Sequence, residues 1–261
     1  MIKNTYDTID YKISELNFMK KYPSEIFYIG NLELLNKPKI SIVGSRRPIS
    51  YTKTLTHKLS SMLSSSGYCI VSGVAMGVDA ISHRAAGSSN TIAVVANGLD
   101  IKYPAVNKAL IEDIQKDGLM LSTYQAGIKA TKYTFVHRNE IVVALGEKLI
   151  VTQADLNSGS LRSVQYAINM GKEIWVLPHR IGDSQGTNKL IQEGLVKVIY
   201  DIDEFIKDLN NQYKPQIIQD DFLQFCSTNP TYDEAVLKYG EKVFEYELLG
   251  KISIENGVIL V

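Results

Sequence analysis

The sequence has 261 residues, of which 45% are hydrophobic and 21% charged, which predicts a folded protein rather than a disordered chain. It contains no apolar signal-peptide core and no run of about 20 apolar residues, so we expect no secretion, no membrane span and a cytoplasmic location. The two cysteines, Cys69 and Cys226, are isolated and no Cys/His cluster occurs, which argues against a disulfide framework and a metal site.

The net charge of zero conceals an uneven distribution. Residues 201–261 contain 5 Lys/Arg and 12 Asp/Glu, a net charge of −7, whereas residues 1–200 carry a net charge of +7. A basic body with an acidic tail is typical of a protein whose body binds an anion, although solvated surfaces often show similar imbalances.

Residues 1–38 are expected to form a helical N-terminal extension, and residues 39–212 a Rossmann-like domain. In this domain, short Val- and Ile-rich runs, typical of strands buried on both faces, alternate with segments of helical length. The runs are residues 40–43, 69–71, 91–95, 119–122, 148–152, 173–177 and 196–199. The helical segments are residues 52–65, 78–86, 106–116, 137–145, 160–169, 188–193 and 201–212. This alternation predicts an α/β fold with an extended, doubly wound, mostly parallel sheet.

The end of the sequence predicts a second, smaller unit. Residues 213–222 lack clear periodicity and are expected to be a linker. Residues 223–261 are expected to form a small winged-helix-like C-terminal domain, with a helix over 232–249 and a hairpin over 251–261. The Asn256-Gly257 pair would supply a type I′ turn for this hairpin.

Three turns rich in glycine and serine follow predicted strands, at residues 44–48, 72–79 and 154–161. Ligands of open α/β sheets bind at the carboxyl ends of the strands, and backbone amides near helix starts attract anions. Arg46 and Arg47 add positive charge to the first turn. Ordinary helix capping could explain any one of these turns, but the three together with the arginine pair favour a phosphate-binding site.

The segment after the fourth strand of the domain mixes cations with aromatic rings, and we expect it to be a loop. It contains Lys129, Lys132, Tyr133, Phe135, His137 and Arg138. Cations that contact the backbone and a ring on which a base stacks are what a sequence-tolerant single-strand site requires. The alternative is that Phe135 and Tyr133 only anchor the loop to the core.

Several common chemistries lack their motifs. There is no Gly-x-x-x-x-Gly-Lys-Ser/Thr loop, and the first turn lacks Gly-x-Gly-x-x-Gly, so neither an ATPase nor a standard dinucleotide site is supported. The four histidines are scattered, and the Asp79/His83 pair is best explained as a packing contact. We therefore expect no catalytic residues, no cofactor and no enzymatic activity.

The motifs, in order and spacing, resemble the DprA/Smf family (DNA-processing protein A) over roughly residues 22–200. They are Gly44-Ser45-Arg46, Ser72-Gly73-x-Ala75-x-Gly77-x-Asp79, Ala96-Asn97-Gly98-Leu99-Asp100-x-x-Tyr103-Pro104, Phe135-x-x-Arg138-Asn139, Ser158-Gly159-Ser160-Leu161, Pro178 and Gly186-Thr187-Asn188-x-Leu190-Ile191-x-x-Gly194.

The resemblance implies a homodimeric protein of natural transformation that binds incoming single-stranded DNA and helps load the RecA recombinase. Together with the turn analysis, it indicates one set of DNA-binding residues. They are Gly44, Ser45, Arg46, Arg47, Ser72, Gly73, Lys132, Phe135, Arg138, Asn139, Ser158, Gly159 and Ser160.

The sequence departs from the family pattern at two positions. Glu140 stands where many members have arginine, which removes a positive charge, and Ala96 stands where glycine is common. The N-terminal extension is also too short for the additional domain that many members carry there.

Two other functions fit the fold class. One is a nucleotide-processing hydrolase of the lysine-decarboxylase-like fold, but residues 156–160 lack that family's Pro-Gly-Gly-x-Gly-Thr turn and no glutamate follows in the helix. The other is a mononucleotide-binding module, which would not need the extended cationic segment around Lys132.

Overall fold

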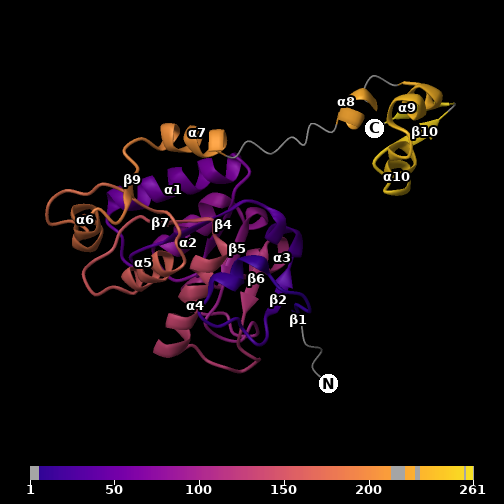
Figure 1. Ribbon diagram of the computed structural model, residues 1–261. Helices are drawn as coiled ribbons and strands as arrows, with labels where there is room; N and C mark the ends of the chain where they lie inside the picture. The colour runs from indigo at the N-terminus through magenta and orange to yellow at the C-terminus, as the bar shows by residue number, and fades with distance from the viewer. Residues whose placement is uncertain (1–5, 213–220, 227–229, 256, 261) are drawn as a thin grey trace. The chain divides into compact units, whose positions relative to one another are not determined.

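The computed structural model describes residues 6–212, 221–226, 230–255 and 257–260. The chain divides into two compact units, Met1–Lys207 and Asp208–Val261 (Figure 1). No helix in the described part of the chain is both long and apolar enough to cross a bilayer.

The first unit contains a nine-stranded sheet with the order β1-β2-β6-β5-β4-β3-β7-β8-β9. The strands from β3 onward pair in parallel, whereas β1 and β2 pair antiparallel at one edge. The parallel strands are β3 (Lys39–Val43), β4 (Cys69–Ser72), β5 (Thr91–Val94), β6 (Leu119–Ser122), β7 (Lys148–Val151), β8 (Ile174–Val176) and β9 (Lys197–Val198). Every predicted apolar run overlaps one of these strands, so the predicted α/β fold with a mostly parallel sheet is confirmed.

Helices join the strands in the predicted alternation. They are α1 (Ser50–Ser65), α2 (Val78–Ala86), α3 (Lys108–Asp117), α4 (Lys132–Leu145), α5 (Gly159–Asn169), α6 (Gln185–Gln192) and α7 (Ile202–Gln212). Helix α1 packs against α2, and α4 packs against α5 (Figure 1). All residues of β3, β4, β5 and β6 are buried, which explains why their sequences are almost continuously apolar.

The strand order places a topological switch at β3. From β3 the chain moves through β4 and β5 to β6 on one side, and α4 then carries it back to β7 on the other side of β3. Val43 at the end of β3 lies opposite Val151 at the end of β7. Ligands of open α/β sheets bind in the crevice at such a switch, outside the carboxyl ends of the strands.

The expectation of a helical extension over residues 1–38 is wrong for the described part of this segment. It contains two 3-10 turns, Ser14–Phe18 and Leu32–Asn36, and two strands, β1 (Asp7–Thr8) and β2 (Phe27–Gly30). Strand β2 pairs antiparallel with β6, with Phe27 opposite Ser122. The apolar residues here therefore cover a sheet edge that is about ninety positions away in sequence, which local periodicity does not reveal.

The loop expected to contain Lys129 to Arg138 is wrong from Lys132 onward, because α4 begins at Lys132. Thr131 and Thr134 form a reciprocal cap in which the Thr131 hydroxyl accepts from the Thr134 amide (3.2 Å) and the Thr134 hydroxyl accepts from the Thr131 amide (2.8 Å). The helical start puts Lys132 and Phe135 one turn apart on the same side of α4.

The second unit contains α8 (Asp221–Cys226), α9 (Tyr232–Tyr239), α10 (Lys242–Leu248) and a hairpin of β10 (Ser253–Glu255) and β11 (Val258–Leu260). The single helix expected over 232–249 is wrong, because Gly240 with φ +56° separates α9 from α10. Residues 213–220 of the expected linker lie outside the described residues. Its last two residues, 221 and 222, belong to α8. Asn256 of the expected turn also lies outside the described residues, and the winged-helix-like arrangement stays a prediction.

Candidate nucleic-acid interface

A hollow with a volume of about 260 Å³ occupies the switch point, beyond the ends of β3 and β7. We call it the switch-point hollow. It unites most of the predicted site, because eight of the predicted residues line it. They are Gly44, Ser45, Arg46, Arg138, Asn139, Ser158, Gly159 and Ser160. The first and third glycine/serine turns therefore meet as the strand-end argument predicts.

The third turn places Ser158 and the start of α5 in the wall of the switch-point hollow. Ser158 occupies the N-cap position of α5, yet its side chain makes no capping hydrogen bond. Its buried hydroxyl has no hydrogen-bond partner in the part of the chain that the structure describes. The amides at the start of α5 lie at the positive end of the helix dipole. Together with Arg46, these groups suit a phosphate.

Gly77 brings the first and second turns into contact. Its φ is +79°, and a Cβ atom at this position would lie 2.3 Å from the Ser45 carbonyl oxygen. The next amide, that of Val78, donates a hydrogen bond to the same carbonyl (3.1 Å). Only glycine permits this approach, so Gly77 fixes the position of the turn that carries Arg46.

Arg138 is buried and fastens the second turn to α4. Its guanidinium donates to the carbonyl oxygen of Gly73 and to that of Val94 (2.9 Å). A Cβ at Gly73 would overlap this guanidinium, so a larger residue there would displace Arg138 from its present position. Burial lowers the pKa of Arg138, an effect that the nearby Asp79 carboxylate opposes. Burial likewise raises the pKa of Asp79, while Arg138 opposes the rise. Arg138 therefore acts first as a structural clamp beneath the site.

The ring of Phe135 lies next to two guanidinium groups. The Arg46 group is 5.1 Å and the Arg138 group 5.6 Å from its centroid. Tyr103, which is 47% exposed, lies 6.2 Å away between ring centroids. Phe135 and Tyr103 line a second, small hollow together with Arg46, Gly73 and other residues, which we call the aromatic hollow. Exposed aromatic surface beside cations is suited to a stacked base.

Three predicted residues lie outside both hollows. Lys132 is exposed at the start of α4, one turn before Phe135, and Arg47 is exposed on an adjacent groove. Ser72 is fully buried and donates to the Ile42 carbonyl (2.6 Å), so its side chain is not presented at the surface. Of the two candidate loop anchors, Tyr133 is 79% exposed and Phe135 is partly buried, so anchoring is wrong for Tyr133.

Several residues that line the hollows are not among the predicted DNA-binding residues. Asp79, Asp155 and Ser163 line the switch-point hollow, and Met76 and Tyr103 line the aromatic hollow. Met76, Asp79 and Asp155 lie in the predicted strand-end turns, and Tyr103 lies in the motif that begins at Ala96, so their positions were the available signal. Ser163, one turn into α5, gave no such signal.

The two departures from the family pattern have different surroundings. Glu140 accepts a hydrogen bond from the Lys20 amide (3.1 Å), so its carboxylate ties α4 to the N-terminal segment. Ala96 is buried and lines the aromatic hollow. No group of three or more His, Cys, Asp or Glu side chains positioned for a metal ion occurs among the described residues.

The family model of DNA recombination-mediator protein A matches residues 5–210. The chain belongs to this family. Among curated relatives, the DNA processing protein DprA of Streptococcus pneumoniae is 40% identical over 176 residues, which are 66% of this chain and 62% of that protein. DprA of Bacillus subtilis is 36% identical over 199 residues, or 73% of this chain and 67% of that protein. The chain thus matches about two thirds of the length of these relatives.

Two solved structures of the family are similar to this chain. DNA processing protein A from Helicobacter pylori, studied for its single-stranded DNA binding mode, has a TM-score of 0.78 and 37% identity, covering 80% of this chain and 97% of that one. DprA from Streptococcus pneumoniae has a TM-score of 0.71 and 35% identity, covering 77% of this chain and 73% of that one. The family and its fold are therefore established for the first unit.

Proposed function

We propose that this protein binds single-stranded DNA at the switch-point edge of its sheet and acts, without catalysis, as a recombination mediator in natural transformation. The observation that carries this proposal is the position of Arg46. Its guanidinium lies 5.1 Å from the Phe135 ring and also lines the hollow that contains Ser158 and the start of α5. A site for phosphates and a surface for bases therefore meet at one side chain.

This arrangement favours a single strand over a duplex. Every base has a π-face, so stacking on Phe135 or Tyr103 is tolerant of sequence and contributes about 1–3 kcal/mol per base. The bases of a duplex are already stacked on their neighbours and would have to be unpaired first. Contacts from Arg46 and the α5 amides to phosphates add affinity that does not depend on sequence.

The family supports two further parts of the proposal. The protein forms a homodimer in the cytoplasm, and it delivers the bound strand to the RecA recombinase. Mediation of this kind requires release of the strand, and phosphate contacts at an open sheet edge permit exchange more readily than an enclosed binding site. No catalytic role is assigned to Asp79, because its carboxyl is buried in the wall of the switch-point hollow and accepts a hydrogen bond from the Ala75 amide (3.3 Å).

Fluorescence anisotropy with labelled oligo-dT and a duplex of equal length, each at two salt concentrations, tests the proposal. We expect tighter binding of oligo-dT and an affinity that falls steeply with salt, because phosphate contacts release counterions. Equal affinity for the two forms would contradict the stacking role. Hydrolysis of a mononucleotide would support the alternative of a nucleotide-processing enzyme.

A further inference from the structure

A third and larger hollow lies beside the other two. Its volume is about 550 Å³, in the range of pockets that accept ligands the size of a nucleotide. It is lined by residues from the start of α1, from α2 and from the 3-10 turn Ala105–Asn107, and we call it the α1–α2 groove. Arg46 lines this groove as well as the switch-point and aromatic hollows, so the three adjoin at one side chain.

The α1–α2 groove is strongly cationic. Arg46, Arg47, Lys53 and Arg84 line it, and no Asp or Glu is among its lining residues. Within the described ranges of the chain, none of these four cations forms an ion pair with a carboxylate. Concentrated positive charge without internal compensation attracts an external anion.

Lys58 provides a contrast on the same helix. It lies five residues after Lys53 on α1, and its ammonium pairs with Asp203 of α7 at 2.7 Å. The chain thus neutralises a lysine on another part of α1 and leaves Lys53 uncompensated where it faces the groove. This difference separates a cation with a structural partner from one that is available to a ligand.

Arg84 is held in position across the groove. Its guanidinium donates to the Asn107 side-chain oxygen (3.2 Å), and Asn107 in turn donates to the carbonyl oxygen of Val74 (2.9 Å). These bonds connect α2, the Ala105–Asn107 turn and the glycine-rich turn after β4. Arg84 is exposed as a residue, so its guanidinium can contact a phosphate at little additional cost in side-chain entropy.

The groove also exposes apolar surface between its cations. Met76 is 44% exposed and Val106 is 69% exposed, and both line the groove. Alternating apolar and cationic surface matches a single nucleic-acid strand, whose bases pack on apolar side chains while its phosphates contact cations. A free inorganic anion would gain no favourable contact from the apolar side chains of the groove.

We propose that the α1–α2 groove binds the next nucleotides of the strand held at the switch-point hollow, with Lys53 and Arg84 contacting their phosphates. The proposal rests on the function proposed above and extends it. The strand would pass from the start of α5 over Arg46 and Phe135 into the groove. The binding site then has two parts that share Arg46, and Lys53 and Arg84 belong only to the second.

Binding of a four-nucleotide and a twelve-nucleotide oligo-dT by the full chain tests this extension. The variant is Lys53→Gln/Arg84→Gln, and the matched control is Lys58→Gln. Each phosphate contact contributes a slope of about 0.7 in log affinity against log salt, or about fivefold at ~0.1 M salt. We therefore expect the double variant to bind the twelve-mer about 25-fold more weakly, with a slope lower by about 1.4, and to bind the four-mer like the wild type.

Arg84→Gln also removes the hydrogen bond to Asn107 and could weaken binding by disturbing the structure. The Lys53→Gln single variant controls for this effect, because no hydrogen bond between Lys53 and Asn107 is among those described. It should lose about fivefold on the twelve-mer at ~0.1 M salt. Arg84→Lys keeps the positive charge, so it should retain most of the twelve-mer affinity that the glutamine substitution at this position loses. Both results, with an unchanged Lys58→Gln control, would support the groove.

Unchanged twelve-mer affinity in the double variant would overturn the extension and leave the proposed function intact. An equal loss on both oligonucleotides would also overturn it, since the groove would then not be a separate part of the site. Failure of the wild type to bind either oligonucleotide would overturn the proposed function itself, and the groove with it. Competition by an acidic peptide but not by oligo-dT would show that the groove accepts a protein partner instead.

Discussion

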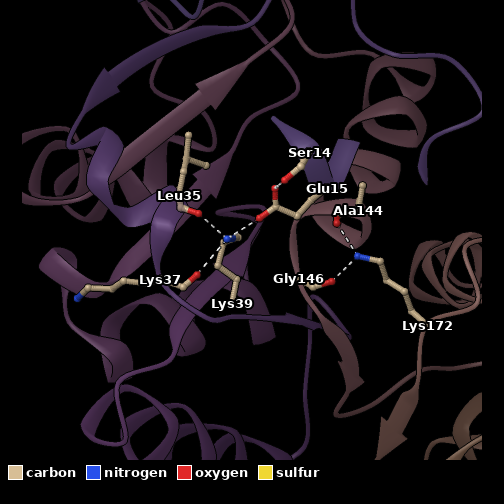
Figure 2. Close-up of polar contacts among 8 residues, drawn as sticks. All are labelled: Ser14, Glu15, Leu35, Lys37, Lys39, Ala144, Gly146 and Lys172. Atoms are coloured by element: carbon tan, nitrogen blue, oxygen red, sulfur yellow. Dashed lines mark hydrogen bonds and ion pairs between the residues drawn. The ribbon is translucent and has the colours of Figure 1, made fainter. Parts of the chain in front are cut away.

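Cationic side chains lie at both ends of the parallel sheet, but they differ in whether they have partners within the protein. At the amino end, the Lys39 ammonium pairs with Glu15 (2.6 Å) and donates to the carbonyl oxygens of Leu35 and Lys37 (Figure 2). The Lys39 side chain is only 5% exposed. At the carboxyl end, Arg46 is exposed and forms no ion pair with a carboxylate among the residues that the structure describes.

The difference distinguishes cations that stabilise the fold from cations that bind a ligand. Lys172 extends the first group, because its ammonium donates to the carbonyl oxygens of Ala144 and Gly146 at the end of α4 (Figure 2). The opposite end of the same helix carries Lys132 and Phe135. Internal partners at the amino end thus hold α4 in place, while its start contributes to the candidate interface.

The largest expected effect is on stability, at the amino end. Lys39→Met should lower the free energy of unfolding by about 3–5 kcal/mol, because it leaves the Glu15 carboxylate and two carbonyls without their partner. Urea denaturation measures this loss. The double variant Glu15→Gln/Lys39→Met should recover part of it, since the uncompensated charge is removed. Reduced oligo-dT affinity of the folded single variant would break the distinction between the two ends.

A second effect at the amino end depends on pH. Burial lowers the pKa of Lys172 from 10.5 to about 8. Between these two values the unfolded chain binds the proton more tightly, so this group's contribution to stability rises with pH. Below pH 8 the Lys172 ammonium is protonated in both the folded and the unfolded chain, and the folded state bears the full free-energy cost of burying its charge. It amounts to at most about 3 kcal/mol, reduced by solvent that reaches the side chain.

Lys172→Met removes this titration. The stability of the wild type relative to the variant should therefore increase from pH 8 to pH 10.5, as measured by urea denaturation at each pH. A difference that is constant across this range would show that the ammonium is not desolvated in the folded state.

At the carboxyl end the expected effects are on binding. Arg46→Ala should weaken oligo-dT binding by about 1.5–3 kcal/mol, the range for hydrogen bonds to charged groups, and should weaken all sequences alike. It should also lower the salt slope by about 0.7. Anisotropy titrations measure both, and thermal unfolding should be nearly unchanged. A large loss of stability would place Arg46 with the structural cations.

Phe135→Ala should weaken binding by about 1–3 kcal/mol through the loss of stacking, with little change in the salt slope. Tyr133→Ala is the matched control, because Tyr133 lies on the same helix and is 79% exposed. Equal losses in the two variants would indicate that Phe135 has no special role in binding.

Much of the fold follows from the sequence because its strands are buried on both faces. Residues 40–43 and 148–152 read as continuous apolar runs, and the structure contains β3 and β7 there. The N-terminal segment was mispredicted because β2 depends on its pairing with β6, a contact that no local pattern encodes. The sequence around Phe27 is compatible with a helix or a strand, and only its pairing with β6 decides between them.

The candidate site was predictable in its location and less so in its details. The rule that ligands bind at strand ends points to Ser45 and Ser158, and the structure brings both to one hollow. The rule did not separate Arg46 from Arg138, since both are arginines in motifs. Only the structure shows that Arg138 is buried against the carbonyls of Gly73 and Val94, while Arg46 remains exposed.

Ultraviolet crosslinking of oligo-dT to the full chain, followed by mass spectrometry of the peptides, tests the central claim most directly. We predict crosslinks to Phe135 and Tyr103, the rings at the carboxyl end of the sheet, and their loss on addition of unlabelled single strand. Crosslinks confined to the amino end around Phe18, or to the second unit, would contradict the account.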